Sequence, residues 1–211
     1  MRTAILLFDG VTALDAIGPY EVLQNAPDNE VCFVARDKGV KRTDFGRLGL
    51  EADYALTDID AADVVLVPGT PTPDALLGDP AVLEWLTAIH AGSTWTTSVC
   101  TGALALGAIG ALAGKRATTH WLAHEALRGF GAEPTEQRVV EDGKVMTAAG
   151  VSSGIDMALT LVERIYDRQT AERIQLVIEY DPQPPFDAGA PSKAPPELVA
   201  ELRAQFGEQM K

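Results

Sequence analysis

The sequence predicts an α/β fold in which a doubly wound, mostly parallel sheet is sandwiched by helices. Short apolar segments rich in β-branched residues alternate along the chain with longer amphipathic segments, which is the pattern of repeated strand–helix units. The strand-like segments are nearly continuous apolar runs, as expected for strands covered on both faces. The 211 residues, of which 46% are hydrophobic and 22% charged, suffice for one domain with a sizeable core.

The first half of the chain contains three strand-like runs. Residues 4–8 form the first, and Gly18-Pro19 then opens a helix to residue 23, because proline is accepted in a first helical turn. The other predicted elements of this half are a strand over 31–35, a charged hairpin region reaching residue 54, a strand over 64–67 that ends at Pro68-Gly69, and a helix capped by Asp79-Pro80 that reaches residue 89.

The second half continues this alternation. Its predicted elements are a strand over 93–99, a helix from Thr101, a short strand over 116–119, a helix over 121–130, a hairpin over 138–146 with an Asp142-Gly143 turn, and helices over 152–166 and 170–180. The prolines of 181–191 predict an extended tail, followed by an amphipathic helix over 197–210 through Leu198, Leu202 and Phe206. We therefore divide the chain into an α/β domain, residues 1–180, and a tail with a short helix, residues 181–211.

Cys100 lies where a strand-like run breaks directly into a helix that opens at Thr101-Gly102. A residue at such a turn projects from the carboxyl edge of the sheet, beside the free N–H groups of the helix. Because a helix N-terminus stabilises negative charge, we expect the pKa of the thiol to lie below its free value of about 8.5 and Cys100 to be a reactive nucleophile. The alternative is a buried, inert cysteine that packs as a small hydrophobe.

Asp15 is the predicted proton carrier for this thiol. It lies between the end of the first strand and the helix that opens at Gly18. If the first strand and the strand before Cys100 both lie centrally in a parallel sheet, the carboxyl and the thiol converge at one edge. There the carboxyl hydrogen-bonds the thiol and moves protons during turnover. Asp15 also fits a helix N-cap or an ordinary loop position, which is the alternative.

The Pro68-Gly69-Thr70 turn is the third part of the predicted site. A glycine at a strand end frees backbone N–H groups for a small anion-binding nest. Together with the N–H of Thr101 and with Gly102, we expect Gly69 and Thr70 to bind substrate and to stabilise negative charge on a reacting atom. A simple turn without a ligand is the alternative.

His120 and Trp121 are predicted to line or support the substrate pocket. His120 and His124 share a helical face, but no third His or Cys stands near them in sequence, so we expect no metal. The chain lacks the P-loop lysine and the dinucleotide glycine spacing, and we expect no organic cofactor. Cys32, inside a strand pattern, is expected to be buried and inert.

Charge and composition exclude other classes of protein. The net charge of −13 argues against a nucleic-acid-binding protein, which needs a basic face. The two cysteines are too few for a disulfide framework, so we expect both to be reduced. Residues 1–8 enter a strand at once rather than forming a signal peptide, and no apolar run approaches the roughly 20 residues of a membrane span. We therefore expect a cytoplasmic protein that binds neither nucleic acid nor membrane.

Several short motifs resemble the ThiJ/PfpI (class I glutamine amidotransferase-like) superfamily, and within it the isonitrile hydratase branch. These motifs are Leu14–Tyr20, Val67–Gly69, Thr97–Gly102, Arg116–Trp121, Arg138–Val140, Gly154–Asp156, Gln175–Tyr180 and Pro184–Gly189. The Thr97–Gly102 and Arg116–Trp121 motifs also resemble the ligand-sensing domains of AraC-type regulators, whereas the tail motif, Pro184–Gly189, resembles the hydratase branch. Superfamily members that resemble proteases or glyoxalases commonly place His after the nucleophile, where this chain has Thr101. The usual Pro-Gly-Gly turn is altered at Thr70, where a positive φ would cause strain.

The resemblance implies a flavodoxin-like fold and a hydro-lyase activity, the hydration of an isonitrile to an N-substituted formamide. Cys100 would attack the terminal carbon to give a covalent thioimidate, with Asp15 moving protons and Thr101 donating a hydrogen bond. Two other functions stay open: a glyoxalase- or deglycase-like reaction on small dicarbonyls, and a non-enzymatic ligand or redox sensor in which Cys100 is oxidised. The resemblance and the apolar Phe186 also lead us to expect a homodimer in which the Pro-rich tail lies across the partner chain.

Overall fold

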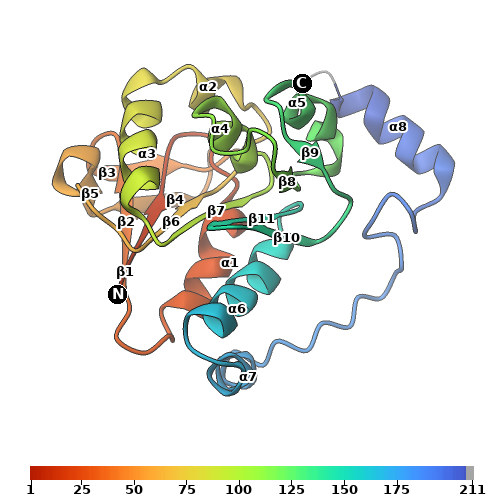
Figure 1. Ribbon diagram of the computed structural model, residues 1–211. Coiled ribbons are helices and arrows are strands. Elements are labelled where there is room, and N and C mark those ends of the chain that lie inside the picture. Colours follow the sequence, from red (N-terminus) through yellow and green to blue (C-terminus); the bar gives the residue numbers. More distant parts are fainter. Residues whose placement is uncertain (208–211) are drawn as a thin grey trace.

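The computed structural model describes residues 1–207 of the chain. Their central element is a seven-stranded sheet (Figure 1). In spatial order its strands are β10 (Val139–Asp142), β11 (Val145–Ala148), β7 (Trp95–Val99), β6 (Val64–Val67), β1 (Arg2–Leu6), β2 (Glu30–Ala35) and β5 (Tyr54–Ala55). Neighbouring strands of this sheet are parallel except for the antiparallel pair β10 and β11. The predicted mostly parallel α/β sheet is confirmed.

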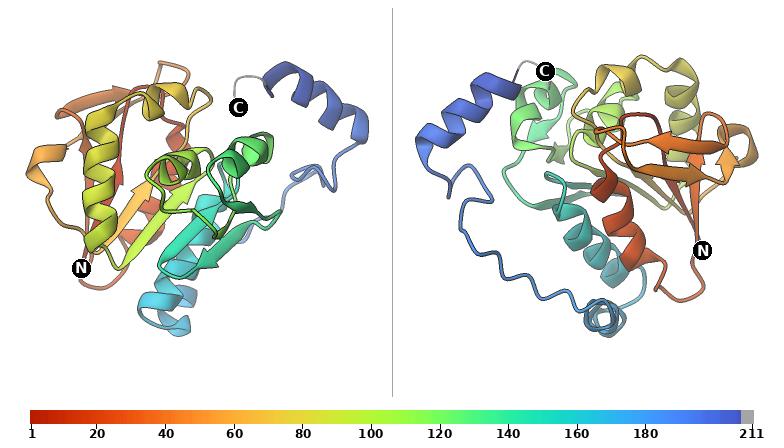
Figure 2. Two further views of the ribbon diagram at one scale, coloured as in Figure 1. Left: turned by 45° about the horizontal axis from the view of Figure 1, so that its top comes forward. Right: turned by 180° about the vertical axis from the view of Figure 1, so that it is seen from behind.

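Helices cover both faces of the sheet (Figures 1 and 2). On one face lie α1 (Ala13–Leu23) and α6 (Ser153–Ile165), with α7 (Arg168–Val177) packed on α6; on the other lie α3 (Pro80–Gly92) and α4 (Gly102–Ala108), with α2 (Asp74–Leu77) and α5 (His124–Gly129) against α4. The strands feed both layers because successive side chains point to opposite faces. In β1, Ala4 and Leu6 join one buried cluster, whereas Ile5 joins the other.

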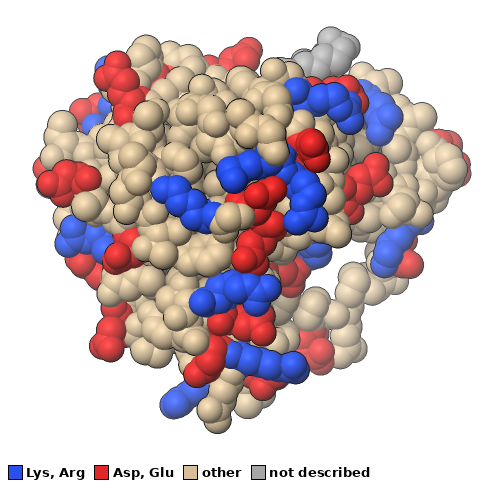
Figure 3. Space-filling model, viewed as in Figure 1, with Lys and Arg blue, Asp and Glu red and all other residues tan. Residues whose placement is uncertain are grey.

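Several smaller elements lie outside the sheet and its covering helices. They are the hairpin of β3 (Gly39–Arg42) and β4 (Gly49–Ala52), the parallel pair β8 (Arg116–Ala117) and β9 (Glu133–Pro134), the single turns η1 (Leu56–Asp58) and η2 (Trp121–Ala123), and the helix α8 (Pro196–Phe206). Acidic and basic side chains are mixed on the face seen in Figure 3. Within residues 1–207, no helix has both the length and the apolar character needed to cross a bilayer.

Two local predictions are confirmed in atomic detail. The 138–146 segment forms the β10–β11 hairpin, and Gly143 in its turn has a φ of 64°. Asp79 caps α3, because its carboxylate accepts hydrogen bonds from the N–H groups of Ala81 at 3.1 Å and Val82 at 3.4 Å. Both features depend on residues adjacent in sequence, which is why sequence signals sufficed.

The predicted start of the first helix is wrong. Helix α1 begins at Ala13 rather than Gly18, so that Asp15 lies in its first turn and Pro19 inside it. The N–H of Thr12 donates to the Gly69 carbonyl at 2.9 Å, which ties the beginning of α1 to the loop after β6. Gly18 meanwhile packs against α6, where an added Cβ would stand 3.1 Å from Ile155. Tertiary contacts therefore extend the helix beyond its local signal.

Other boundaries also move. The strand predicted over 116–119 is limited to β8, which pairs with β9 outside the main sheet. The helix predicted over 121–130 is divided into η2 and α5, and the one predicted over 170–180 is α7, whose first turn is capped by Asp167. The short helix α2 had no sequence prediction.

The C-terminal segment is extended where it leaves the domain, and it then forms a helix that packs back on the domain. Residues 181–195 form neither helix nor strand, as the prolines predict, and α8 then lies beside α5 (Figures 1 and 2). The guanidinium of Arg203 stands 5.7 Å from the centre of the Trp121 ring. The predicted end of this helix at Met210 lies outside the described residues.

Candidate active site

The loops that follow four neighbouring strands meet at the carboxyl edge of the sheet. Asp15 follows β1, Gly69 follows β6, Cys100 follows β7 and Val151 follows β11, and these strands are adjacent in the order β11-β7-β6-β1. From β1 the chain crosses to β2, which pairs with one edge of β1, and it later returns to form β6, which pairs with the other edge. Such a switch point is where open α/β sheets bind ligands.

Cys100 occupies a strained elbow between β7 and α4. Its φ is 58°, a left-handed conformation that is uncommon for a residue with a side chain. Its N–H donates to the carbonyls of Ala148 at 3.1 Å and Ala149 at 2.9 Å, and the Thr119 hydroxyl donates to its carbonyl at 2.8 Å. These three hydrogen bonds hold the elbow. Only 4% of Cys100 is exposed to solvent.

Asp15 is fully buried and anchored by one of its two carboxyl oxygens. Oδ2 accepts a hydrogen bond from the N–H of Gly69 at 2.9 Å. Within residues 1–207, the other oxygen, Oδ1, makes no hydrogen bond. Asp15 and Cys100 act on each other, since a charge on Asp15 raises the pKa of the thiol and the thiol lowers the pKa of the carboxyl. The structure thus brings together the two groups that the sequence analysis paired.

Burial sets the protonation of this pair. It raises the pKa of Asp15 from 3.8 to about 7, and the charge of Asp44 adds to the rise. The pKa of the Cys100 thiol is also raised, first by burial and second by the charge of Asp15. The lowered thiol pKa predicted from the helix N-terminus is therefore not found, because loss of water outweighs the N–H groups of Val151 and Thr101 that lower this pKa.

The Gly69-Thr70 turn holds Asp15 and Thr101 in place. A Cβ on Gly69 would stand 2.6 Å from the Thr101 nitrogen and 3.0 Å from Asp15 Oδ2, so only glycine fits between them. The N–H of Thr70 donates to the Thr101 hydroxyl at 2.8 Å, and that hydroxyl donates to the Thr70 carbonyl at 2.7 Å. Both N–H groups of the turn are therefore engaged within the protein. Thr70 does not take a positive φ, so the expected strain is absent.

Gly102 has a packing role in the structure. A Cβ there would come within 2.1 Å of the Val67 carbonyl oxygen, so α4 approaches β6 as closely as backbone allows. The N–H of the preceding residue, Thr101, lowers the pKa of the Cys100 thiol. Contact of Gly69, Thr70 or Gly102 with substrate stays a prediction.

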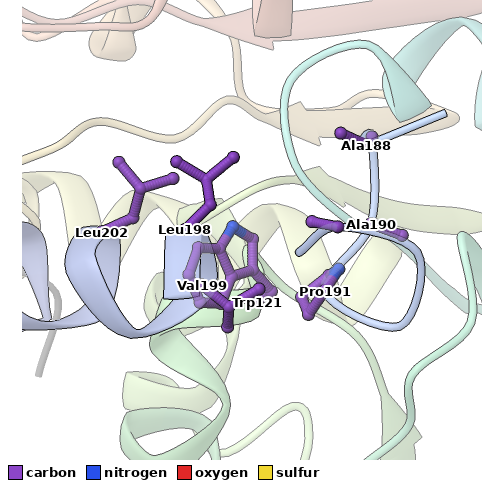
Figure 4. Close-up of a pocket in the computed structure, with 9 residues that line it drawn as sticks. Trp121, Ala188, Ala190, Pro191, Leu198, Val199 and Leu202 are labelled. Carbon is purple, nitrogen blue, oxygen red and sulfur yellow. The ribbon is translucent and has the colours of Figure 1, made fainter. Parts of the chain in front are cut away.

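His120 lies over the loop after β11. A Cβ on Gly150 would stand 2.7 Å from His120 Cδ2, so the imidazole packs on this glycine. Burial lowers the pKa of His120 to about 4. The imidazole is therefore neutral near pH 7 and does not act as an acid there. Its neighbour Trp121 lines an apolar pocket with Pro191 and helix α8 (Figure 4). Among residues 1–207, no three His, Cys, Asp or Glu side chains gather to hold a metal ion.

Val151 and Thr119 are parts of the site that the sequence analysis missed. The N–H of Val151 lowers the pKa of the Cys100 thiol, and Thr119 holds the Cys100 carbonyl. The signal for Val151 was a second strand-to-helix turn, in which β11 ends and α6 begins within a few residues. Thr119 lies in the Arg116–Trp121 motif, but its role depends on contact across the fold, so the motif did not indicate that its hydroxyl binds the Cys100 carbonyl.

Comparison with known proteins shows the family of the chain. The DJ-1/PfpI family model matches residues 1–164. An isonitrile hydratase of Pseudomonas putida is 42% identical over 211 residues, which cover 100% of this chain and 92% of that protein. Protein DJ-1 homolog A of Arabidopsis thaliana is 27% identical over 180 residues, 83% of this chain and 45% of that protein. The crystal structure of a THiJ/PfpI family protein from Pseudomonas syringae has a TM-score of 0.93 at 36% identity, and the match covers 99% of this chain and 88% of that one. The chain belongs to the DJ-1/PfpI family.

Proposed function

We propose that this protein is a cysteine-dependent hydro-lyase that converts an isonitrile to an N-substituted formamide. The observation that carries the proposal is a thiol at a strained elbow beside a buried carboxyl whose pKa is about 7. The full-length similarity to an isonitrile hydratase, at 42% identity, supports the choice of substrate.

The first half-reaction adds the thiol across the terminal carbon of the isonitrile. The sulfur of Cys100 bonds to that carbon, and the thiol proton reaches the same carbon through Asp15, which gives the thioimidate R–N=CH–S–Cys100. A carboxyl with a pKa of about 7 suits both acceptance and delivery of this proton near neutral pH. The N–H groups of Thr101 and Val151 stabilise negative charge on the sulfur while the proton is away from it.

The second half-reaction uses water. Asp15 removes a proton from a water molecule whose oxygen bonds to the thioimidate carbon, and that proton passes to the substrate nitrogen. The carbon–sulfur bond then breaks, the remaining water proton returns to Cys100, and R–NH–CHO leaves. Thiol, carboxyl and water supply each proton and each bond of the cycle, so the net reaction consumes one isonitrile and one water.

The burial of Cys100 favours an isonitrile over a dicarbonyl. Only 4% of Cys100 is exposed, so little space for a substrate lies beside the residue. The isocyano group is linear and presents a single terminal atom, whereas a dicarbonyl must bring a trigonal carbon and its substituents to the sulfur. A protonated thiol beside a carboxyl also matches an addition that uses both the sulfur and its proton.

A substrate panel tests the proposed function. We expect the purified protein to convert cyclohexyl isonitrile to cyclohexylformamide, followed by chromatography, and to leave methylglyoxal unconsumed under the same conditions. Consumption of methylglyoxal without formamide production would replace the proposal by the glyoxalase-like alternative. Selective oxidation of Cys100 by mild peroxide, with neither substrate turned over, would favour a sensor.

We also propose that the protein works as a homodimer in the reducing cytoplasm, where a nucleophilic thiol persists. In support, Leu176, Val177 and Phe186 on α7 and the tail leave 80%, 66% and 80% of their surface exposed, which favours a covering partner. Light scattering is expected to give twice the chain mass of 22.4 kDa, and Phe186→Asp to shift the mass toward the monomer. A monomer mass for the unmodified protein at micromolar concentration would contradict the proposal.

A further inference from the structure

Three segments that resemble the ThiJ/PfpI superfamily have no role in the chemistry above, and the structure joins them in one cluster. Arg138, just before β10, pairs with Asp156 of α6, and its Nη2 donates to the Ser152 hydroxyl at 3.2 Å. The hydroxyl of Tyr180, after α7, donates to the other oxygen of Asp156 at 3.0 Å. We call these four side chains the Arg138 cluster.

The Arg138 cluster borders the turn over 149–153, which contacts the active site. Within this turn, the carbonyl of Ala149 accepts the Cys100 N–H at 2.9 Å, and the N–H of Val151 lowers the pKa of the Cys100 thiol. Arg138 holds the turn at both ends. Its carbonyl accepts the Ala149 N–H at 2.9 Å, and its guanidinium binds Ser152.

The conformation of this turn needs external support. Val151 has a φ of 33°, which is rare for a β-branched residue and persists only where neighbouring contacts impose it. Ser152 lies at the N-cap of α6, yet its side chain makes no capping bond to the helix. Its hydroxyl accepts the hydrogen bond from Arg138 instead. Arg138 thus binds the N-cap side chain of α6 beside the strained residue.

We propose that Arg138 is a positioning residue of the active site: by joining Ser152 and Asp156, it holds the 149–153 turn in the strained form that directs the Val151 N–H at the Cys100 sulfur. Tyr180 fixes the orientation of Asp156 and thereby links the segment after α7 to this turn. The inference rests on the proposed role of Cys100 as nucleophile, but not on the identity of the substrate.

The test measures Cys100 reactivity without any isonitrile. The rate of Cys100 alkylation by iodoacetamide, followed by mass spectrometry of its peptide between pH 7 and 9, reports how well the protein stabilises the thiolate. In Arg138→Gln, we expect this rate to fall about three- to tenfold at each pH, because a hydrogen bond to the charged sulfur is weakened. Tyr180→Phe is expected to produce a smaller fall in the same direction.

Arg164→Gln is the matched control. Arg164 lies on the same helix, α6, and pairs with Glu141 and Glu163 without touching the turn, so its alkylation rate should equal that of the unmodified protein. Equal rates in Arg138→Gln and Arg164→Gln would overturn the proposal. If Arg138→Gln does not fold, as judged by thermal melting, Tyr180→Phe and Ser152→Ala decide by the same criterion.

The outcome is separable from that of the proposed function. Loss of reactivity in Arg138→Gln would support the positioning role even for a protein that leaves every isonitrile unchanged. For an active protein, the same variant should lower kcat with cyclohexyl isonitrile while KM stays near its original value, because the Val151 N–H acts on charge that develops during reaction. A rise in KM alone would contradict the positioning role.

Discussion

Cys100→Ser is expected to reduce isonitrile turnover by at least about 10³-fold, because it removes the proposed nucleophile while keeping the shape of the side chain. A serine hydroxyl at this buried position gives up its proton far less readily than a thiol and attacks carbon less well as a neutral group. Both residues carry a Cβ, so the cost of the φ of 58° is the same in the variant and in the unmodified protein. The measurement is kcat for formamide production, with a melting curve to confirm folding.

Cys32→Ser provides the control for this prediction. Cys32 is also buried, but it lies in β2, where its thiol contacts the Thr3 carbonyl at 3.5 Å, and burial raises its pKa to about 11. Its replacement should leave kcat within a few-fold of the original value. When the reaction of the unmodified protein is quenched with acid, mass spectrometry should find the Cys100 peptide heavier by the mass of one substrate molecule. Turnover by Cys100→Ser within tenfold of the original rate would assign the attack to water instead.

Asp15→Asn is expected to abolish turnover and, at pH 8, to stabilise the protein. The amide keeps the hydrogen bond from Gly69 but moves no proton, so kcat should fall by at least about 10²-fold. The free energy of unfolding rises in the variant because the unmodified protein must bury a carboxylate at pH 8, whereas the amide is neutral. The difference between a pKa of 3.8 in the unfolded chain and about 7 in the fold corresponds to at most about 4 kcal/mol of lost stability.

The pH dependence of this gain follows from the raised pKa. Below pH 3.8 the carboxyl is protonated in both states, so Asp15 imposes no penalty; the penalty grows as pH rises and is complete above about pH 7. Urea unfolding should therefore show Asp15→Asn more stable than the unmodified protein at pH 8 and equal to it near pH 4. Asp142→Asn is the control. The Arg116 N–H lowers the pKa of Asp142, so the fold favours its charged form, and this variant should be less stable than the unmodified protein at pH 8. An Asp15→Asn variant that is less stable at pH 8 would show that the carboxyl is not held at a cost.

Local sequence patterns were enough to place Cys100 and Asp15 at the same edge of the sheet. The change from β-branched residues to Thr101-Gly102 marks the elbow at Cys100, and the strand that ends before Asp15 marks a second strand-to-helix connection at the same edge. Parallel strands bring their carboxyl ends together whatever loops follow them, so the meeting of these two residues could be inferred without coordinates.

Contacts between distant segments decided the remainder. The extension of α1 back to Ala13 depends on Gly69, and the use of the Gly69 and Thr70 N–H groups depends on Asp15 and Thr101. No spacing in the sequence records these pairs, because each joins two loops that meet only when the sheet forms.

Strand and helix periodicity and the order of parallel strands are local or topological properties, so they predict the α/β fold, the elbow at Cys100 and the meeting of this thiol with Asp15. Tertiary contacts were needed for the raised pKa values of that pair, for the contribution of the Val151 N–H to the thiol pKa and for the ion pair between Arg138 and Asp156. Desolvation and long-range hydrogen bonds depend on which atoms exclude water around a group, and this is settled only once all four loops have met.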